Sequence, residues 1–573
     1  MENSLSKINA HRQSIGFVVG GSLKANLFVR LTLPAQSVQE GAFVVIKSGD
    51  WQFYGLVTDL QLTSTDPRYA ENPGGERFSP AVSRLLSQQT LFTNLEVLPA
   101  LMVESGPEFD DPRYSEWRQG HPEDDHPMPI KTVPSHHANA WLASAEDVAT
   151  IFGMPGDGGN FMIGRTREQD HPVCIDLDKF VQRSAGIFGA TGSGKSFLTR
   201  IILAGLIQRN KASVLVFDMH NEYGFDDVAS DTGKPTIGLK TKFSSKVRVV
   251  AIGRNSTIRG RVPDYHLELR ESEVQPEDIE MLTRELNLRE TTPTTLDALL
   301  HSFGPDRWFH EFKAMEVGTV IENEDGKKVP APGSVAYWAN GEGVNASAAE
   351  GLHSKMTRLF NLPYIIPDEN AVPGTSLTEV IKSLQNEQHV ILSFGDYEKD
   401  LDYLLVSNLL TRKIREAWEK ITNEYRSKGT KEPRPLVIAV EEAHKLLNRE
   451  MAAQTSFSTI AREMRKYYVT LLIIDQRPSQ IYDEVMSQLG TRVSGWLGDE
   501  NDIAAVLSGL AGRDALRGML ARLQPKEEVL LLGWGVPMPI LVRSRRYDQT
   551  FWDELLPRSK PLDADQAMKD LGF

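Results

Sequence analysis

The chain has 573 residues, enough for three or four domains of ordinary size and for large buried cores. Its 63 Lys and Arg residues stand against 77 Asp and Glu residues, and the formal net charge of −14 excludes a globally basic nucleic-acid binder. Any contact with DNA must therefore be local, as in a ring channel whose outer surface is acidic.

The first stretch, residues 1–105, predicts a small β-barrel. Short runs rich in Val, Ile, Phe, Leu and Thr alternate with turn residues such as Gly20-Gly21 and Pro34. These runs are Ser14–Val19, Ala25–Leu33, Ala42–Ser48, Gln52–Leu62 and Leu91–Val103. Several strands at this spacing favour a barrel. No stripe of aromatic and basic residues supports nucleic-acid binding there, so ring assembly is the simpler role.

The next stretch, residues 106–160, is polar and rich in proline, and it predicts a linker. Its histidines at 121, 126, 136 and 137 match no standard zinc spacing, and no cysteine accompanies them. We therefore expect no metal site in this stretch.

From residue 161 to residue 545 the pattern changes to α/β. Apolar strands alternate with apolar helical segments, which predicts a mainly parallel sheet covered on both faces. The candidate strands are Ile187–Phe188, Val214–Met219, Val247–Ile252, His389–Phe394, Leu436–Val440, Val469–Ile474 and Val529–Trp534. Residues 225–385 interrupt this alternation and predict a mainly helical insertion. Residues 546–573 form a C-terminal tail whose role the sequence does not indicate.

Three simple features bear on the compartment. The single cysteine, Cys174, excludes an intrachain disulfide framework and is interpreted as a small core residue. No apolar run approaches the roughly 18 residues that span a membrane, and the N-terminal residues lack the pattern of a signal peptide. We expect a cytoplasmic protein with no membrane segment.

One motif dominates the α/β region: Gly189–Ser196 reads G-x-x-x-x-G-K-S, the Walker A loop. Its glycines allow a tight backbone whose N–H groups point at phosphate oxygens. Lys195 is expected on the β- and γ-phosphates of ATP, and the Ser196 hydroxyl on Mg²⁺. A short apolar approach and a helical segment flank the loop, as the motif requires. The predicted nucleotide-binding residues are Gly189, Thr191, Gly192, Ser193, Gly194, Lys195, Ser196 and Phe197.

A phosphate loop needs an acidic partner, and the apolar run 435–440 ends in Glu441 and Glu442. We expect Glu441 to help hold Mg²⁺ and Glu442 to orient and polarise the attacking water. The alternative is a pair of solvated charges at a strand end. Asp218 also stands at the end of a predicted strand, where α/β sheets place ligands. It could support Mg²⁺ or the attacking water, or it could merely cap a loop.

Two further residues are candidates for the chemistry. Gln476 follows the strand at 469–474 and could sense the γ-phosphate. Arg465, in Arg462-Glu463-Met464-Arg465-Lys466, could complete the site of a neighbouring subunit by stabilising charge on the transferring phosphoryl group. A solvated basic helix face is an equal alternative for Arg465 and the favoured one for Arg462.

Together these residues resemble the HerA family, hexameric ATP-driven DNA translocases of the FtsK–HerA branch. The resemblance rests on the barrel start, G-A-T-G-S-G-K-S, D-M-H-N-E-Y from Asp218, E-E-A-H from Glu441, R-E-M-R-K and D-Q-R-P. It covers nearly the whole chain and suggests a bacterial member. Many relatives carry a small residue where Asp475 precedes Gln476, so the polarity beside the sensor differs here.

The resemblance implies a RecA-like P-loop core, an N-terminal HAS barrel, a hexamer and ATP hydrolysis between subunits. It implies Glu442 as the catalytic glutamate, Gln476 as the sensor and Arg465 as the trans arginine. It also implies DNA and a partner nuclease or NAD-consuming effector, in anti-phage defence or DNA-end processing.

The leading hypothesis is thus a ring motor on DNA. Basic stretches such as Arg254–Arg261 could line its channel, but a solvated loop is the favoured interpretation of that stretch. A ring scaffold that ATP switches and that activates an effector is the alternative. A protein-translocating ATPase is a third reading, which the lack of a membrane segment disfavours.

Overall fold

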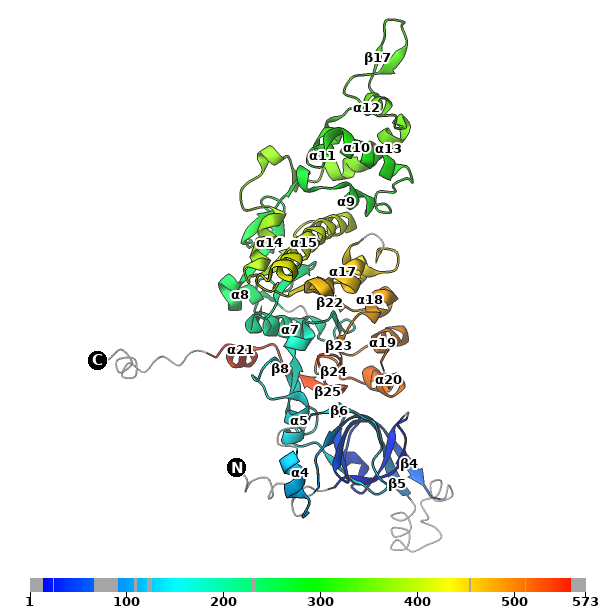
Figure 1. Cartoon of the computed structure of the whole chain (residues 1–573), viewed down its shortest axis with the longest axis vertical. Helices are drawn as coiled ribbons and strands as arrows, with labels where there is room; N and C mark the ends of the chain where they lie inside the picture. The colour runs from blue at the N-terminus through cyan, green and yellow to red at the C-terminus, as the bar shows by residue number, and fades with distance from the viewer. Residues whose placement is uncertain are drawn as a thin grey trace, which may run out of the picture. The chain divides into compact units, whose positions relative to one another are not determined.

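The computed structural model describes residues 14–23, 25–65, 91–107, 111–120, 126–228, 233, 235–452, 455–510 and 512–557 (Figure 1). The chain forms two compact units, each of which is described by itself. Unit 1 comprises Met1–Phe180, Ile187–Ile201 and Gly490–Phe573, and unit 2 comprises Val181–Gly186 and Ile202–Leu489.

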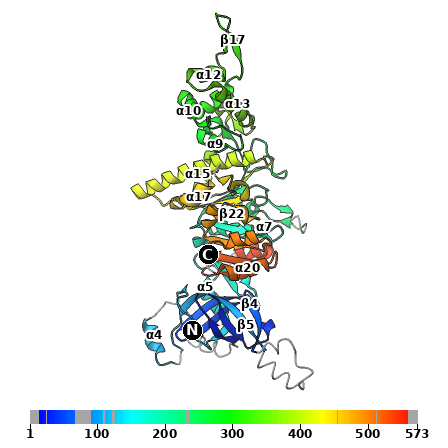
Figure 2. The ribbon, with the colours of Figure 1, turned by 90° about the vertical axis from the view of Figure 1, so that its right-hand side faces the viewer.

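Unit 1 begins with a closed antiparallel barrel, as predicted (Figure 2). Its strands are β1 (Gly16–Gly21), β2 (Leu27–Leu31), β3 (Phe43–Ser48), β4 (Trp51–Ser64), β5 (Leu91–Glu104) and β7 (Asn139–Leu142). They follow the order β2-β1-β7-β3-β4-β5, and β5 pairs again with β2 to close the ring. Buried and partly exposed residues alternate along β2, so apolar side chains such as Val29 fill the interior.

The stretch predicted as a linker, 106–160, contributes to this barrel. Strand β7 pairs with both β1 and β3, and Ala140 on it is fully buried. A strand of four residues among polar neighbours gives too weak a sequence pattern to be recognised. The same stretch holds β6 (Met128–Pro129), which pairs with β5, and the helices α4 (Tyr114–Gly120) and α5 (Ala145–Phe152). The linker prediction is therefore wrong for these residues.

The remainder of unit 1 is an antiparallel set of strands. Its order is β23 (Thr491–Ser494), β24 (Glu528–Gly533), β25 (Ile540–Ser544), β8 (Asn160–Thr166) and β9 (Pro172–Asp176). Four helices accompany them: α6 (Leu177–Phe180), α19 (Glu500–Leu507), α20 (Arg513–Ala521) and α21 (Gln549–Leu555). Cys174 on β9 is buried, as expected for a core residue, and burial raises the pKa of its thiol to about 12. The expectation of a mainly parallel sheet does not hold in this unit.

Unit 2 contains the predicted parallel sheet. Its order is β15 (Tyr265–Leu267), β14 (Val247–Ile252), β20 (His389–Ser393), β11 (Ser213–Asp218), β21 (Leu436–Glu441) and β22 (Val469–Asp475). The strands β11, β20, β21 and β22 are buried along their whole length, which explains their continuous apolar sequences. The helices around them are α8 (Leu239–Phe243), α14 (Leu377–Gln385), α15 (Asp400–Lys428), α16 (His444–Leu447), α17 (Phe457–Glu463) and α18 (Asp483–Ser487).

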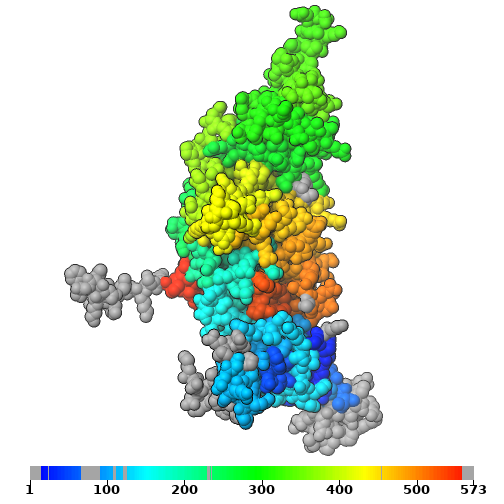
Figure 3. Space-filling model, in the orientation of Figure 1, coloured from blue at the N-terminus to red at the C-terminus, as the bar shows by residue number. Residues whose placement is uncertain are grey.

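The helical part of unit 2 is narrower than the predicted insertion at 225–385, because that range also contains the sheet strands β14 and β15. The helices are α9 (Pro276–Glu280), α10 (Thr292–Phe303), α11 (Trp308–Ala314), α12 (Val335–Gly341) and α13 (Ala346–Phe360). Small paired strands lie at β12 (Asp227–Val228) with β13 (Pro235–Thr236), and at β16 (Leu269–Arg270) with β19 (Ile365–Ile366). The hairpin of β17 (Val320–Glu322) and β18 (Lys328–Pro330) projects from the helices in Figure 3.

Strand β10 (Ala185–Phe188) carries the chain from unit 2 into unit 1. It is buried throughout and leads into the phosphate loop and α7 (Lys195–Arg209). The strand, loop and helix thus follow one another as the Walker A motif requires. Within the described ranges, α15 is the longest helix at 29 residues, and no helix is apolar over a membrane-spanning length.

Candidate nucleotide site

The phosphate loop in unit 1 takes a conformation that depends on glycine. Gly192 and Gly194 have φ values of +78° and +92°, which L side chains rarely adopt. A Cβ on Gly194 would lie 3.2 Å from the Cα of Lys526, so a neighbouring segment also packs closely there. Any larger residue at Gly194 would strain the backbone and press on that segment.

Backbone hydrogen bonds fix the loop to its own unit. The Ala190 N–H donates to the Trp496 carbonyl at 2.9 Å, and the Ser193 N–H donates to Ala190 at 3.0 Å. The Lys526 N–H donates to the Ser193 carbonyl at 2.9 Å. These bonds hold the backbone of the loop against neighbouring segments of unit 1.

The donors in and after this loop fit a phosphate chain. Ser196 and Phe197 stand in the first turn of α7, where an α-helix leaves its N–H groups without helical partners. The Ser193 hydroxyl is buried and has no hydrogen-bond partner within the described part of the chain. The Lys195 side chain is also buried. The ring of Phe197 lies 6.3 Å from that of Tyr547, so a residue just outside α21 also borders the start of α7.

In unit 2, acidic side chains gather where parallel strands end. Asp218 ends β11 and Glu441 ends β21, and both are almost fully buried. Asp218 accepts hydrogen bonds from the N–H groups of Glu222 at 2.8 Å and Tyr223 at 3.0 Å. Burial, and then the nearby charge of Glu441, raise the pKa of Asp218 to about 7. The loop-capping role left open for Asp218 is thus real, and its carboxyl also belongs to the acidic cluster.

Glu441 has two partners that sequence reasoning did not assign. The Tyr223 hydroxyl donates to one carboxylate oxygen at 3.2 Å, and the His220 N–H donates to the other at 3.3 Å. The His220 ring nitrogen Nδ1 also lies 3.6 Å from this carboxylate, and that side-chain contact raises the pKa of His220. Both partners lie in the D-M-H-N-E-Y segment, as its third and last residues. A carboxylate keeps lone pairs beyond these two bonds, which suits a magnesium ligand.

Glu442 stands on a sharp turn directly after β21. Its φ of +45° is unusual for a residue with a side chain and costs about 1 kcal/mol or more. The Gln476 amide donates to the Glu442 carboxylate at 2.9 Å. The two residues predicted as catalytic glutamate and sensor are therefore in direct contact.

A second pair supports this turn. The Asp475 carboxylate is fully buried and accepts hydrogen bonds from the His444 N–H at 2.7 Å and the Arg477 N–H at 2.7 Å. The His444 ring nitrogen Nδ1 lies 3.0 Å from the same carboxylate and 3.6 Å from Glu442. The bond to Asp475 raises the pKa of His444. The aspartate that departs from the family pattern thus ties the end of β22 to the residues after β21.

The remaining basic candidates differ in their surroundings. Arg465 lies exposed in a short 3-10 helix, Met464–Tyr467, on the surface of unit 2. Arg462 pairs with Glu484 at 3.2 Å, in agreement with a solvated basic face.

The basic stretch proposed for a DNA channel is largely neutralised. Arg254 pairs with buried Glu268 at 2.9 Å, Arg259 pairs with Asp227, and Arg261 lies 3.8 Å from Asp226. Each arginine therefore already has a carboxylate partner, which disfavours this stretch as a DNA-contacting surface. Its sequence did not reveal this, because the partners come from other loops.

The histidines at 126, 136 and 137 form no metal-binding group with other ligands in the described residues, and position 121 lies outside them.

Comparison with known proteins shows a similarity to one family. Residues 161–414 match the family described as "Helicase HerA, central domain". This central part of the chain resembles the HerA family. The chain is 21% identical over 543 residues to the DNA double-strand break repair helicase HerA of Sulfolobus acidocaldarius, covering 93% of this chain and 94% of that protein. It is 23% identical to the protein of the same name from Pyrococcus furiosus, covering 65% and 66% of the two chains. It is an ATP-hydrolysing enzyme of the HerA-like translocase and helicase class.

Solved structures show more distant likenesses. VirB4 of Thermoanaerobacter pseudethanolicus is 15% identical with a TM-score of 0.42, covering 69% of this chain and 98% of that one. The bacterial conjugative coupling protein TrwB is 14% identical with a TM-score of 0.42, covering 66% and 87%.

Proposed function

We propose that this HerA-like protein is an ATP-driven DNA translocase that acts as a hexameric ring. The observation that carries the proposal is the contact between Glu442 and Gln476 on a strained turn, in a chain that also has a complete phosphate loop. Strained carboxylate turns of this kind persist where a catalytic group must be held in one position. The relatives named above are helicases of double-strand break repair, which supports DNA as the substrate.

In this proposal the phosphate loop binds the triphosphate of ATP. Lys195 neutralises the β- and γ-phosphates, while the loop N–H groups hold their oxygens. Ser196 and Glu441 are the residues that would hold Mg²⁺, directly or through water. When bound, the ion offsets the charge that develops on the phosphates. Tyr223 and His220 fix the orientation of Glu441 through their hydrogen bonds.

Glu442 would accept the proton of the attacking water and orient that water toward the γ-phosphate. In the present arrangement its carboxylate accepts a hydrogen bond from Gln476, which occupies a lone pair that the attacking water would use. Hydrolysis therefore requires Gln476 to turn from Glu442 toward the γ-phosphate. This movement of Gln476 would couple the presence of the γ-phosphate to catalysis by Glu442.

Arg465 would act in a neighbouring subunit. Its exposed position on a short helix at the surface supports a role across a subunit boundary. Subunits with Arg465→Ala and subunits with Glu442→Gln should each be inactive alone. Mixed rings should regain activity, because some sites then combine an intact Glu442 with a neighbour's intact Arg465. Absence of rescue in rings shown to be mixed would contradict the trans role.

A motor of this kind performs no cutting, so we further propose a partner nuclease or NAD-consuming effector. DNA-end processing or anti-phage defence are the settings that suit such a pair. Co-purification with the products of neighbouring genes, followed by assay of nuclease and NAD cleavage with and without ATP, tests this part. An effector whose activity is the same with and without this protein would contradict the proposed partnership.

Displacement of a third strand from a DNA triplex tests translocation itself. A translocase should displace the strand in an ATP-dependent manner, and the Glu442→Gln variant should not. The alternative function, a ring scaffold that ATP switches, predicts no displacement by either protein, with effector activation retained in Glu442→Gln. The hydrogen bond from Gln476 to Glu442 is the observation that favours this alternative, because a nucleotide that displaced Gln476 would change the contacts of Glu442 without any DNA.

A further inference from the structure

A second lysine lies against the phosphate loop. Lys526 stands in the short segment between α20 and β24, all within unit 1. Its N–H donates to the Ser193 carbonyl at 2.9 Å. A Cβ built on Gly194 would lie 3.7 Å from the Cβ and 3.8 Å from the Cγ of Lys526. The stem of the lysine thus runs beside the loop, next to the glycine that precedes Lys195.

The backbone of Lys526 is unfavourable for a lysine. Its φ is +68°, a region where glycine and asparagine are favoured and other residues cost about 1 kcal/mol or more. The backbone contact with Ser193 needs only the N–H group, which glycine supplies equally well. The backbone of the turn therefore gives no reason for a lysine here, and we look to its side chain for the reason.

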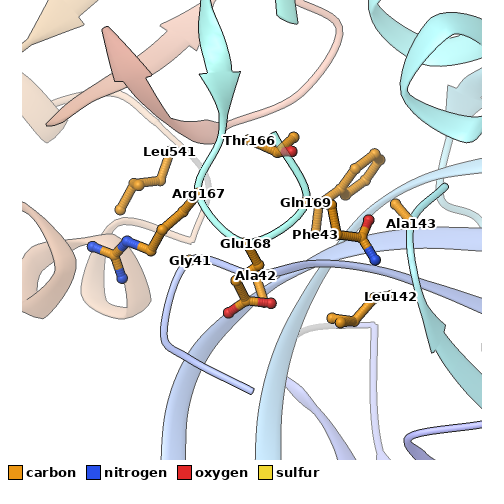
Figure 4. Close-up of a pocket in the computed structure, with 10 residues that line it drawn as sticks. All are labelled: Gly41, Ala42, Phe43, Leu142, Ala143, Thr166, Arg167, Glu168, Gln169 and Leu541. Atoms are coloured by element: carbon orange, nitrogen blue, oxygen red, sulfur yellow. The ribbon is translucent and has the colours of Figure 1, made fainter. Parts of the chain in front are cut away.

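Ion pairs hold the segment on both sides of Lys526. Glu528 is buried and forms a bidentate pair with Arg167, at 2.7 and 2.6 Å. The same Arg167 donates to the Glu40 carbonyl of the barrel at 2.7 Å, and Figure 4 shows it beside the barrel residues Gly41 and Ala42. Arg522 pairs with the Glu40 carboxylate on the other side. The barrel thus anchors the segment that brings Lys526 to the loop.

We propose that Lys526 binds the β- and γ-phosphates of the nucleotide in the same subunit, as a second cation beside Lys195. The inference rests on the proposed function, since it adds a residue to the same site. A triphosphate bears several negative charges in a chain whose net charge is −14, so a further cation close to the loop improves binding. The side chain of Lys526 is exposed, and the hydrogen bond from its N–H to the Ser193 carbonyl keeps its backbone beside the loop.

The test compares Lys526→Gly with Lys526→Arg by titration with the non-hydrolysable analogue AMP-PNP and with inorganic tripolyphosphate. Lys526→Gly keeps the N–H group and suits the positive φ, so its thermal midpoint should equal or exceed that of the wild type. Its Kd for both probes should rise about 10-fold, because a charge-assisted contact is lost. Lys526→Arg should stay within about threefold of the wild type.

A matched pair controls for net charge. Lys131 is also exposed in unit 1 but lies in the barrel region, so Lys131→Met and Lys526→Met each remove one positive charge. Lys526→Met should weaken binding of AMP-PNP and tripolyphosphate, whereas Lys131→Met should not. Unchanged binding in Lys526→Gly, with a wild type that binds AMP-PNP, overturns this inference and leaves the proposed function intact. A wild type that binds neither probe overturns both.

Discussion

The phosphate loop of unit 1 and the acidic cluster of unit 2 are built from opposite chemistry. The loop offers backbone N–H groups, a hydroxyl and Lys195, which are mostly donors suited to an anion. The cluster offers Asp218, Glu441, Glu442 and Asp475, which are acceptors suited to a cation or to the proton of a water. The first region depends on glycine conformations, and the second depends on side-chain pairs that hold buried charges. We therefore predict that substitutions in the two regions separate nucleotide binding from bond cleavage.

Glu442→Gln should give the largest effect. The amide cannot accept the proton of the attacking water, so turnover should fall about 100- to 10,000-fold. The variant keeps the shape of the side chain and a carbonyl acceptor for Gln476. Its Kd for AMP-PNP should therefore match the wild type. Steady-state phosphate release and titration measure the two quantities, with exposed Glu463→Gln as the control. Weaker AMP-PNP binding by Glu442→Gln would contradict the assignment of nucleotide binding to the phosphate loop and of bond cleavage to the acidic cluster.

Lys195→Ala should come next, with turnover reduced about 100- to 1,000-fold through loss of charge stabilisation on the phosphates. Unlike Glu442→Gln, it should also weaken AMP-PNP binding. Circular dichroism should show an intact fold, because the loop is held by backbone bonds that alanine does not remove. Normal turnover in this variant would refute the assignment of the loop.

Asp475→Asn tests whether Asp475 supports His444 and Glu442 within the acidic cluster. Loss of the charged partner should lower the pKa of His444 toward its ordinary value, and turnover should fall about 10-fold as Glu442 loses its support. In the wild type the folded-state pKa of His444 is raised. Its contribution to stability is therefore full at low pH and is lost as pH rises through that folded pKa. NMR titration of the histidine signals measures the change. A His444 pKa that is the same in both proteins would contradict the role of Asp475.

Asp218→Asn should change the pH dependence of stability. The folded-state pKa of Asp218 is about 7, above the ordinary value of 3.8. Its contribution is thus present below pH 3.8 and is lost as pH rises toward 7, by at most about 1.4 kcal/mol per pH unit. Without Mg²⁺, the thermal midpoint of the wild type should decline more than that of the variant between pH 5 and pH 8. Parallel curves would show that Asp218 does not titrate in this range.

The sequence predicted what local patterns determine. The Walker A loop, the apolar strand that ends at Glu441 and the barrel were all recognisable, because each is a contiguous pattern with a physical cause. The contacts that could not be predicted from the sequence join segments that are far apart along the chain. Strand β7 has only four residues, and Tyr223 meets Glu441 only through the fold. The roles of the individual site residues remain predictions.

Charge patterns were the least informative part of the sequence. The sequence left two interpretations of the arginines from Arg254 to Arg261 open, a channel surface and the favoured solvated loop. Carboxylates from other loops pair with these arginines, which disfavours the channel. Lys526 stood out in no motif, since its relevance depends on a positive φ and on contact with Gly194. A run of charged residues is visible in the sequence. Whether those charges can bind a ligand depends on the residues that the fold places beside them.

The most direct test of a DNA motor is ATP hydrolysis by the purified protein with and without double-stranded DNA, for the wild type and for Glu442→Gln. We predict that DNA stimulates turnover by the wild type and that the variant shows no turnover in either condition. Wild-type turnover that is the same with and without DNA would contradict the motor and favour a scaffold switched by another protein.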